Sequence, residues 1–185
     1  MSITDMDANT LRLRCDGCPF LDRPVVAGEG PLSAERVIVG EAPGEVEVRE
    51  GRPFVGDAGG RLRARLSDIG VDVSTVYITN SVLCHPKGNQ SPPPKEAIAA
   101  CHQRLIKEVQ QRMPRKVMAL GGTAAKSLTG KRTIYRLRLL HSVPSPYFDG
   151  DCEVRVTYHP SPSALNRDRA YPGRFDEDIL WLGED

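Results

Sequence analysis

The sequence lacks an excess of charge of either sign, a long apolar run and an internal repeat. Its 25 Lys and Arg residues nearly balance 24 Asp and Glu residues, which leaves a net charge of +1. No overall basic field attracts nucleic acid, so nucleic acid would have to bind at a local patch. No apolar run is long enough to cross a bilayer, and residues 1–10 are too polar for a signal peptide. These absences exclude a membrane protein and predict a cytoplasmic one.

The composition is typical of one globular domain. The chain has 185 residues, of which 39% are hydrophobic and 26% are charged, and this is enough to build a core. Its 15 prolines and 17 glycines gather mostly in discrete clusters, as they do in structured loops. We therefore expect a single domain that spans residues 1–185 and includes the N-terminal cysteines.

Five cysteines stand out, and a reducing cytoplasm argues against disulfides among them. Cys15 and Cys18 form a C-x-x-C pair, whereas sixteen residues separate Cys84 from Cys101. Four thiolates suit an iron–sulfur cluster or a zinc ion, although the spacing is not that of a zinc ribbon. Alternatively, Cys84 and Cys101 are small buried hydrophobic residues and the first pair are loop thiols. We interpret Cys152 as a spare thiol.

Apolar segments of two periodicities alternate along the chain and predict strands that alternate with helices. The expected strands span residues 36–39, 76–80, 116–120 and 154–158. The expected helices span residues 57–69, 94–113, 124–128 and 175–181. This order predicts a three-layer α/β/α fold with a central, mainly parallel four-stranded sheet.

The stretch 40–56 follows the first expected strand and is rich in glycine, proline and acidic residues. We predict a long acidic loop here, followed by a helix that Asp57 caps. The loop carries two carboxylates, Glu41 and Glu47, and one aromatic ring, Phe54. In an open α/β sheet, ligands bind at the carboxyl ends of the strands, so this loop is a candidate site. The alternative is a glycine-proline turn with solvated glutamates.

Two further strand ends carry polar side chains. Asn80 ends the second expected strand, and His159 follows the fourth. In a parallel sheet both would meet the acidic loop at one edge, and an amide, an imidazole, carboxylates and an aromatic ring would line one site. Each residue also has a structural alternative: Phe54 in the core, Asn80 as a strand-end cap, and His159 as a turn residue before proline.

Three motifs and the cysteine pattern together resemble a known family. They are Gly40-Glu41-Ala42-Pro43-Gly44, continued by Glu47, Gly51-Arg52-Pro53-Phe54-Val55-Gly56 and Ala58-Gly59; Thr79-Asn80, closely followed by Cys84; His159-Pro160-Ser161; and the four cysteines. In order and spacing they resemble the family 4 uracil-DNA glycosylases, from Cys15 to the final helix.

The resemblance implies an enzyme of base excision repair. Such an enzyme hydrolyses the N-glycosidic bond of uracil that has flipped out of DNA, and it leaves an abasic site. The resemblance also implies a structural [4Fe–4S] cluster bound by Cys15, Cys18, Cys84 and Cys101. We expect uracil-containing DNA as the partner and a monomer associated with the nucleoid.

The resemblance and the side-chain chemistry assign roles to the strand-end residues. Phe54 would stack on the base, and the Asn80 amide would bind O4 and N3–H of uracil. His159 would donate a hydrogen bond to O2 as negative charge develops there. A carboxylate would stabilise the cationic sugar and orient the attacking water; we favour Glu41 and keep Glu47 as the alternative. The expected substrate-binding residues are completed by Gly40 and Ala42.

Contacts with the DNA backbone are expected after the His-Pro motif, from Ser161, Ser163, Asn166 and Arg167. Hydroxyls, amides and guanidinium groups are usual phosphate partners, and Lys87 and Arg52 would contribute. The basic run 131–138 is either a second DNA-binding patch or a solvated strand or hairpin.

Departures from the family pattern keep other functions open. The run His159-Pro160-Ser161-Pro162 also resembles family 5 relatives, which would mean a broader range of deaminated bases. More distant relatives place an Asp where this chain has Ala42, and family members often have an acid where it has Val48. These two positions would suit a catalytically silent DNA-binding member of the fold. An unrelated zinc or iron–sulfur binding module is a third alternative.

Overall fold

The computed structural model of the chain describes Cys15 and residues 17–184. Within them, one four-stranded sheet lies at the centre, all parallel and in the strand order β2-β1-β3-β4. Its strands are β1 (Arg36–Gly40), β2 (Val76–Asn80), β3 (Lys116–Leu120) and β4 (Glu153–Thr157). Each predicted strand lies within one residue of an observed one, and the predicted fold class is confirmed.

Both faces of the sheet are buried, which explains the nearly continuous apolar runs of its strands. Val37 and Val39 belong to the core on one face. Ile38 belongs to the core on the other face, where it is level with Ile78 and Met118 of the neighbouring strands. The alternation along β1 thus divides one strand between two hydrophobic cores.

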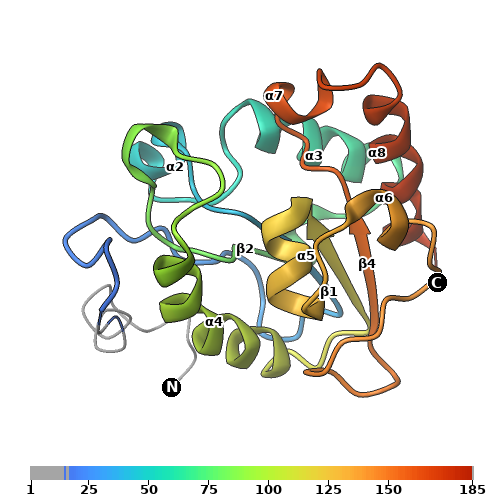
Figure 1. The fold of residues 1–185 in the computed structure, drawn as a ribbon. Coiled ribbons are helices and arrows are strands. Elements are labelled where there is room, and N and C mark those ends of the chain that lie inside the picture. The colour runs from blue at the N-terminus through green and yellow to red at the C-terminus, as the bar shows by residue number, and fades with distance from the viewer. Residues whose placement is uncertain (1–14, 16, 185) are drawn as a thin grey trace.

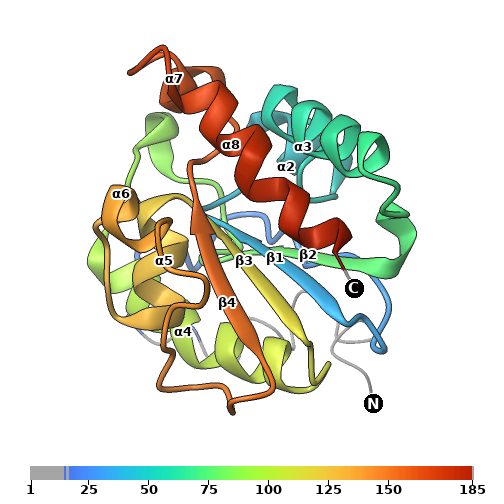
Figure 2. The same ribbon diagram turned by 90° about the vertical axis from the view of Figure 1, so that its right-hand side faces the viewer.

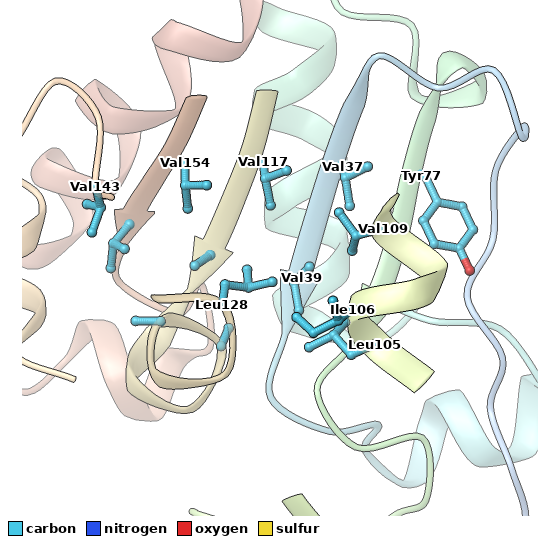
Figure 3. Close-up of a cluster of buried hydrophobic side chains, with 14 of the residues drawn as sticks. Val37, Val39, Tyr77, Leu105, Ile106, Val109, Val117, Leu128, Val143 and Val154 are labelled. Atoms are coloured by element: carbon cyan, nitrogen blue, oxygen red, sulfur yellow. The ribbon is translucent and has the colours of Figure 1, made fainter. Parts of the chain in front are cut away.

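Helices cover both faces of the sheet. They are α3 (Asp57–Asp68), α4 (Lys95–Gln110), α5 (Gly121–Thr129) and α8 (Tyr171–Leu180). Leu105 of α4 and Leu128 of α5 enter the first core (Figure 3), and α3 and α8 lie over the second (Figure 2). The three-layer prediction is therefore confirmed. In the part of the chain that the structure describes, no helix combines the length and apolar character that crossing a membrane requires.

Short helices replace irregular segments that the sequence predicts. They are α2 (Glu45–Glu50), α6 (Ile134–Leu137) and α7 (Pro162–Leu165), and 3-10 turns form at Val73–Thr75, Lys87–Asn89 and Trp181–Gly183. The prediction of an uninterrupted acidic loop is therefore wrong, and so is the strand or hairpin alternative for residues 131–138. Each of α2, α6 and α7 buries one residue or none, so no apolar periodicity announces it.

The parallel strands all point toward one end of the molecule, where α2 and α7 lie (Figures 1 and 2). At this end α3 begins at Asp57, and Gly56, not Asp57, occupies the cap position. Gly44 precedes α2, and Gly51 ends it in the left-handed conformation, with φ of 68°. The segment after β1 is therefore a strand, a short helix, a turn and a second helix.

Candidate active site

The carboxyl ends of the strands open onto a cavity of about 400 Å3, here called the strand-end cavity. Glu41 follows β1, Asn80 ends β2 and His159 follows β4, and all three line it. The other predicted residues on its wall are Ala42, Glu47, Phe54 and Ser161. The structure therefore brings together the residues that the sequence placed at separate strand ends.

Gly40 lets an aromatic ring and an amide meet above the end of β1. A Cβ atom at this position would lie 2.4 Å from Oδ1 of Asn80 and 2.5 Å from Cζ of Phe54. Both distances are too short for any side chain larger than hydrogen. Gly40 is therefore required to be glycine, because its neighbours Phe54 and Asn80, which both line the cavity, leave no room for a side chain.

Phe54 holds an unusual backbone conformation, with φ of 53°. Its carbonyl oxygen accepts a hydrogen bond from Nε of Arg63 at 3.0 Å, and a Cβ at Gly59 would lie 1.9 Å from that oxygen. The ring is 5% exposed and packs into the second core while it lines the cavity. Its centroid lies 5.9 Å from that of the His159 ring. Phe54 is thus both a core residue and a wall of the site.

Asn80 carries an unused hydrogen-bond acceptor. The residue is 2% exposed, and its Oδ1 has no hydrogen-bond partner within the described residues. Its backbone carbonyl is held, because Arg104 donates from NH2 to it at 2.9 Å. A buried polar atom without a partner costs about 1–3 kcal/mol, and a ligand that donates a hydrogen bond would offset this cost. The backbone at Asn80 is therefore held in place, and its side chain has one acceptor available.

His159 is neutral at neutral pH and presents an N–H group. The backbone N–H of Ser161 donates to its Nδ1 at 3.2 Å, so Nδ1 acts as an acceptor and the ring proton is on Nε2. Burial lowers the pKa of His159, and the nearby carboxylates of Glu41 and Glu47 oppose this shift. The ring can therefore donate a hydrogen bond without carrying a charge.

The two glutamates make different hydrogen bonds. Oε1 of Glu41 accepts from the Ser91 hydroxyl at 2.6 Å, and Oε2 accepts from the Thr123 hydroxyl at 2.5 Å. Glu47 instead accepts from three backbone N–H groups, those of Gly44, Val55 and Gly56, at 3.1, 2.9 and 2.7 Å. Glu41 is thus oriented by side chains, whereas Glu47 joins the start of α2 to the turn that carries Phe54.

Three residues of the site are absent from the sequence-based expectations. Ser91 and Thr123 orient Glu41, and His85 lines the cavity with its Nδ1 2.9 Å from the Pro43 carbonyl oxygen. Thr123 follows the end of β3, so the strand-end rule, applied to the remaining strand, would have found it. Ser91 lies in a proline-rich loop and carries no such signal.

Three of the four candidate cluster cysteines share one hydrophobic region. Cys84 and Cys101 belong to a buried group with Phe20, and Cys18 packs against it. The backbone N–H of Cys18 donates to the Cys15 carbonyl at 2.9 Å, which forms the C-x-x-C turn. Burial raises the pKa of Cys18, and nearby Cys101 adds to this shift. The donor set fits a sulfur-bound metal centre, but within the described residues no three His, Cys, Asp or Glu side chains are arranged as metal ligands.

Cys152 lies apart from this region. It packs against the first core, on the side of the sheet that α4 and α5 cover. Burial raises the pKa of its thiol to about 11, and Glu153 contributes to the shift. A thiol with so high a pKa is a poor nucleophile and a poor ligand at neutral pH.

The predicted backbone-contact residues lie around α7. Ser161 caps this helix, with its hydroxyl oxygen 3.3 Å from the Ala164 N–H, and Ser163, Asn166 and Arg167 are exposed. Two other predicted contributors differ, because Lys87 is exposed whereas Arg52 forms an ion pair with Glu29 at 2.6 Å. In the basic run, Arg138 is paired with Asp178 at 2.8 Å.

Most of this sequence is similar to that of known proteins. The family model of the uracil DNA glycosylase superfamily matches residues 27–182. A type-4 uracil-DNA glycosylase of Pyrobaculum aerophilum is 38% identical over 175 residues, which cover 89% of this chain and 86% of the relative. Another, from Thermotoga maritima, is 38% identical over 156 residues, which cover 83% and 80%. A type-5 uracil-DNA glycosylase of Pyrobaculum aerophilum is 30% identical over 177 residues, which cover 84% and 74%. The chain belongs to the uracil DNA glycosylase superfamily and, within it, to the type-4 uracil-DNA glycosylases, as its motifs predicted.

Proposed function

We propose that the protein removes uracil from DNA by hydrolysing the N-glycosidic bond, and that it leaves an abasic site. The observation that carries this proposal is the buried, unpartnered Oδ1 of Asn80 on the wall of the strand-end cavity. Uracil in DNA has an N3–H donor that this oxygen would accept, and family membership supports the same substrate. The base must leave the stack to reach a site this deep.

Asn80 and Phe54 would select the base. The amide of Asn80 offers a donor to O4 and an acceptor to N3–H of uracil, and the Phe54 ring offers a flat face. Cytosine has an amino group at position four and no N3–H. The amide N–H of Asn80 would therefore face another donor, and the amide oxygen would find no N–H to accept from. The mismatch leaves buried polar groups unpaired and costs about 1–3 kcal/mol. The pocket therefore discriminates by hydrogen bonding.

His159 would stabilise the leaving base. When the bond between C1′ and N1 breaks, its electron pair moves onto uracil and charge accumulates at O2. The neutral imidazole can donate from Nε2 toward that oxygen because Nδ1 is occupied by the Ser161 N–H. Such a donor, already in place, lowers the barrier without reorganisation during the reaction.

Glu41 is our choice for the carboxylate that acts on the sugar. Both of its oxygens bind hydroxyl groups, which hold the carboxylate toward the cavity and can also bind water. It would stabilise positive charge at C1′ and orient water, whose oxygen bonds to C1′ while the water proton passes to the Glu41 carboxylate and the electron pair of the broken bond leaves with uracil. Ala42 lines the same cavity but has no group that can do this. The amide contacts of Glu47 support a role in holding the loop.

We further propose that Cys15, Cys18, Cys84 and Cys101 bind a [4Fe–4S] cluster. The shared hydrophobic region of three of these thiols supports this. When bound, the cluster would supply structural cross-linking between the N-terminal segment, the loop after β2 and α4. A brown colour with iron–sulfur absorbance, as against a colourless zinc protein, tests the assignment.

The proposed enzyme is a monomer of the cytoplasm that works at the nucleoid. Its substrate is uracil-containing DNA, which family membership supports. Thiols remain reduced in the cytoplasm, which supports that location for a cysteine-bound cluster.

Cleavage of a labelled oligonucleotide with one uracil, followed by alkali, tests the activity. Parallel strands carry thymine, hypoxanthine or xanthine in the same position. We expect scission at uracil alone. Scission at the purine lesions as well would indicate a broad pocket like that of family 5 relatives. No scission at any base by protein with a full complement of metal would contradict the proposal and favour a silent DNA-binding protein.

A further inference from the structure

A second cavity of about 430 Å3 adjoins the strand-end cavity and is here called the adjoining hollow. The two share wall residues at Glu41, Ala42, Ser91, His159 and Ser161. The far wall of the adjoining hollow comes from the start of α6 and from α7 and α8. The two volumes are similar, so a ligand that extends from the first cavity has room for a second unit in the next one.

Two arginines that have no carboxylate partner among the described residues line the adjoining hollow. Arg132 and Arg167 both line it and are exposed. Neither guanidinium has an ion pair with a carboxylate among the residues that the structure describes. Its one lining carboxylate, Glu41, already accepts hydrogen bonds from two hydroxyls. Two arginines from separate segments suit a phosphodiester group.

Aromatic side chains line the same hollow. Tyr135 of α6 is 55% exposed, so its ring is accessible to a ligand in the hollow. Tyr158 is only 5% exposed and stacks on Tyr171 with centroids 3.9 Å apart, yet its hydroxyl has no hydrogen-bond partner within the described residues. A ligand that forms a hydrogen bond would satisfy this buried hydroxyl. An exposed ring beside basic residues is the usual platform for an unstacked base.

We propose that the adjoining hollow binds the nucleotide next to the target uridine, with its phosphate on Arg132 and Arg167 and its base against Tyr135. The inference rests on the proposed function, because it takes the strand-end cavity as the site of the flipped uracil. It gives α6 and Arg132, two residues before the helix, a role in holding the single strand. Arg132 and Tyr135 thereby join the DNA-binding surface, whereas Arg138 of the same basic run is committed to Asp178.

Binding to strands with one neutral linkage tests the contact without relying on catalysis. Two oligonucleotides carry an uncleavable abasic analogue with a methylphosphonate on its 5′ or 3′ side, and Kd is measured by fluorescence anisotropy for wild type and Arg132→Gln. On one side only, we expect the neutral linkage to weaken wild-type binding roughly tenfold and Arg132→Gln binding only about threefold, because Arg167 alone then contacts the phosphate and interacting partners are not additive.

Two further variants sharpen the test. Arg115 is exposed just before β3, at the opposite end of the sheet, so Arg115→Gln should respond to the neutral linkage as wild type does. Tyr135→Phe keeps the ring and should bind as wild type, whereas Tyr135→Ala should bind several-fold more weakly. The slope of log Kd against log salt should fall by about 0.7 for Arg132→Gln and stay unchanged for Tyr135→Ala.

The inference would be overturned if the effects of Arg132→Gln and of each neutral linkage on Kd were additive. It would also be overturned if Arg115→Gln reduced the effect of the neutral linkage as Arg132→Gln does. The cleavage assay is separate. Wild type that removes uracil but shows additive binding effects retains the proposed function and loses only the adjoining nucleotide site. Wild type that shows the expected coupling but removes no uracil retains the nucleotide site and loses the proposed activity.

Discussion

At the scale of single residues, Glu41 and Glu47 both face the strand-end cavity and differ in what they bind. Hydroxyls of Ser91 and Thr123 hold Glu41, whereas backbone N–H groups hold Glu47. Hydroxyls can reorient to share a carboxylate with water, while backbone amides in a fixed turn cannot. We therefore propose that the same charge serves catalysis at Glu41 and loop structure at Glu47.

Replacing each glutamate by glutamine separates the two roles. Glu41→Gln should lower kcat by roughly 10²- to 10⁴-fold, as for a group that acts on protons and developing charge, with little change in the free energy of unfolding. Glu47→Gln should lower that free energy by about 1–3 kcal/mol, because part of its charged acceptor set is lost. Single-turnover kinetics and urea unfolding measure both. The reverse pattern would assign the chemistry to Glu47.

The lowered pKa of His159 predicts a pH dependence of stability. Its folded-state pKa lies below the unfolded value of about 6.5, so between these two values the unfolded state binds more protons. Stability contributed by the neutral ring is therefore present above pH 6.5 and is lost as the pH falls through the folded pKa. In urea unfolding at pH 7.5, 6.5 and 5.5, His159→Gln should lose less stability toward acid than wild type. Parallel profiles would show that His159 does not titrate as its burial requires.

Much of the site at this scale follows from residue type and strand position. Asn80, His159 and Phe54 lie where strand ends and motifs put them. Neither rule places the hydroxyl partners of Glu41 in the site, because these hydroxyls come from the proline-rich loop and from the start of α5. Contacts between separate loops depend on how each loop closes, which no local pattern in the sequence specifies.

At the scale of elements, the start of α3 is shaped to fit Phe54. Gly59 lets the first turn of the helix approach the Phe54 carbonyl, where a Cβ would lie 1.9 Å from the oxygen. At Gly60, the next residue, a Cβ would point into open space, with no atom of the described residues within 4 Å apart from its chain neighbours and the backbone of its own helix. Packing therefore requires glycine at position 59 but not at position 60, where glycine only weakens the helix.

This pair provides a matched test of helix packing. Gly60→Ala should stabilise the protein by roughly 0.5–1 kcal/mol, the helix propensity difference between glycine and alanine. Gly59→Ala should destabilise it by more than that and should also slow uracil removal, since the clash displaces Phe54. Thermal unfolding and single-turnover rates measure the two effects. Equal behaviour of both variants would mean that the close approach at Gly59 is not required.

Secondary structure was predictable where burial imposes a period. The strands are apolar runs covered on both faces, and α3 and α4 each bury a regular stripe. The short helices α2 and α6 lack such a stripe. They form because local geometry permits them, as at Gly44 and Gly51 around α2, and propensity alone does not fix such short elements.

At the scale of the whole molecule, α4 joins the cysteine region to the site. It carries Cys101 and, one turn later, Arg104, whose NH2 donates to the backbone carbonyls of Asn80 and Ser81 at 2.9 and 3.0 Å. Arg104 also pairs with buried Glu108, so its guanidinium is held in place. A cluster that anchors α4 would therefore support the strand end from which Asn80 projects.

The central claim is that Asn80 reads uracil in the strand-end cavity. The most direct measurement is the single-turnover rate of uracil removal from a single-stranded oligonucleotide by wild type and Asn80→Ala, with the free energy of unfolding measured for both. Loss of one buried hydrogen-bonding group predicts a rate roughly ten- to hundredfold lower, equivalent to about 1–3 kcal/mol, in a variant that remains folded. A folded Asn80→Ala protein that removes uracil at the wild-type rate would contradict the claim.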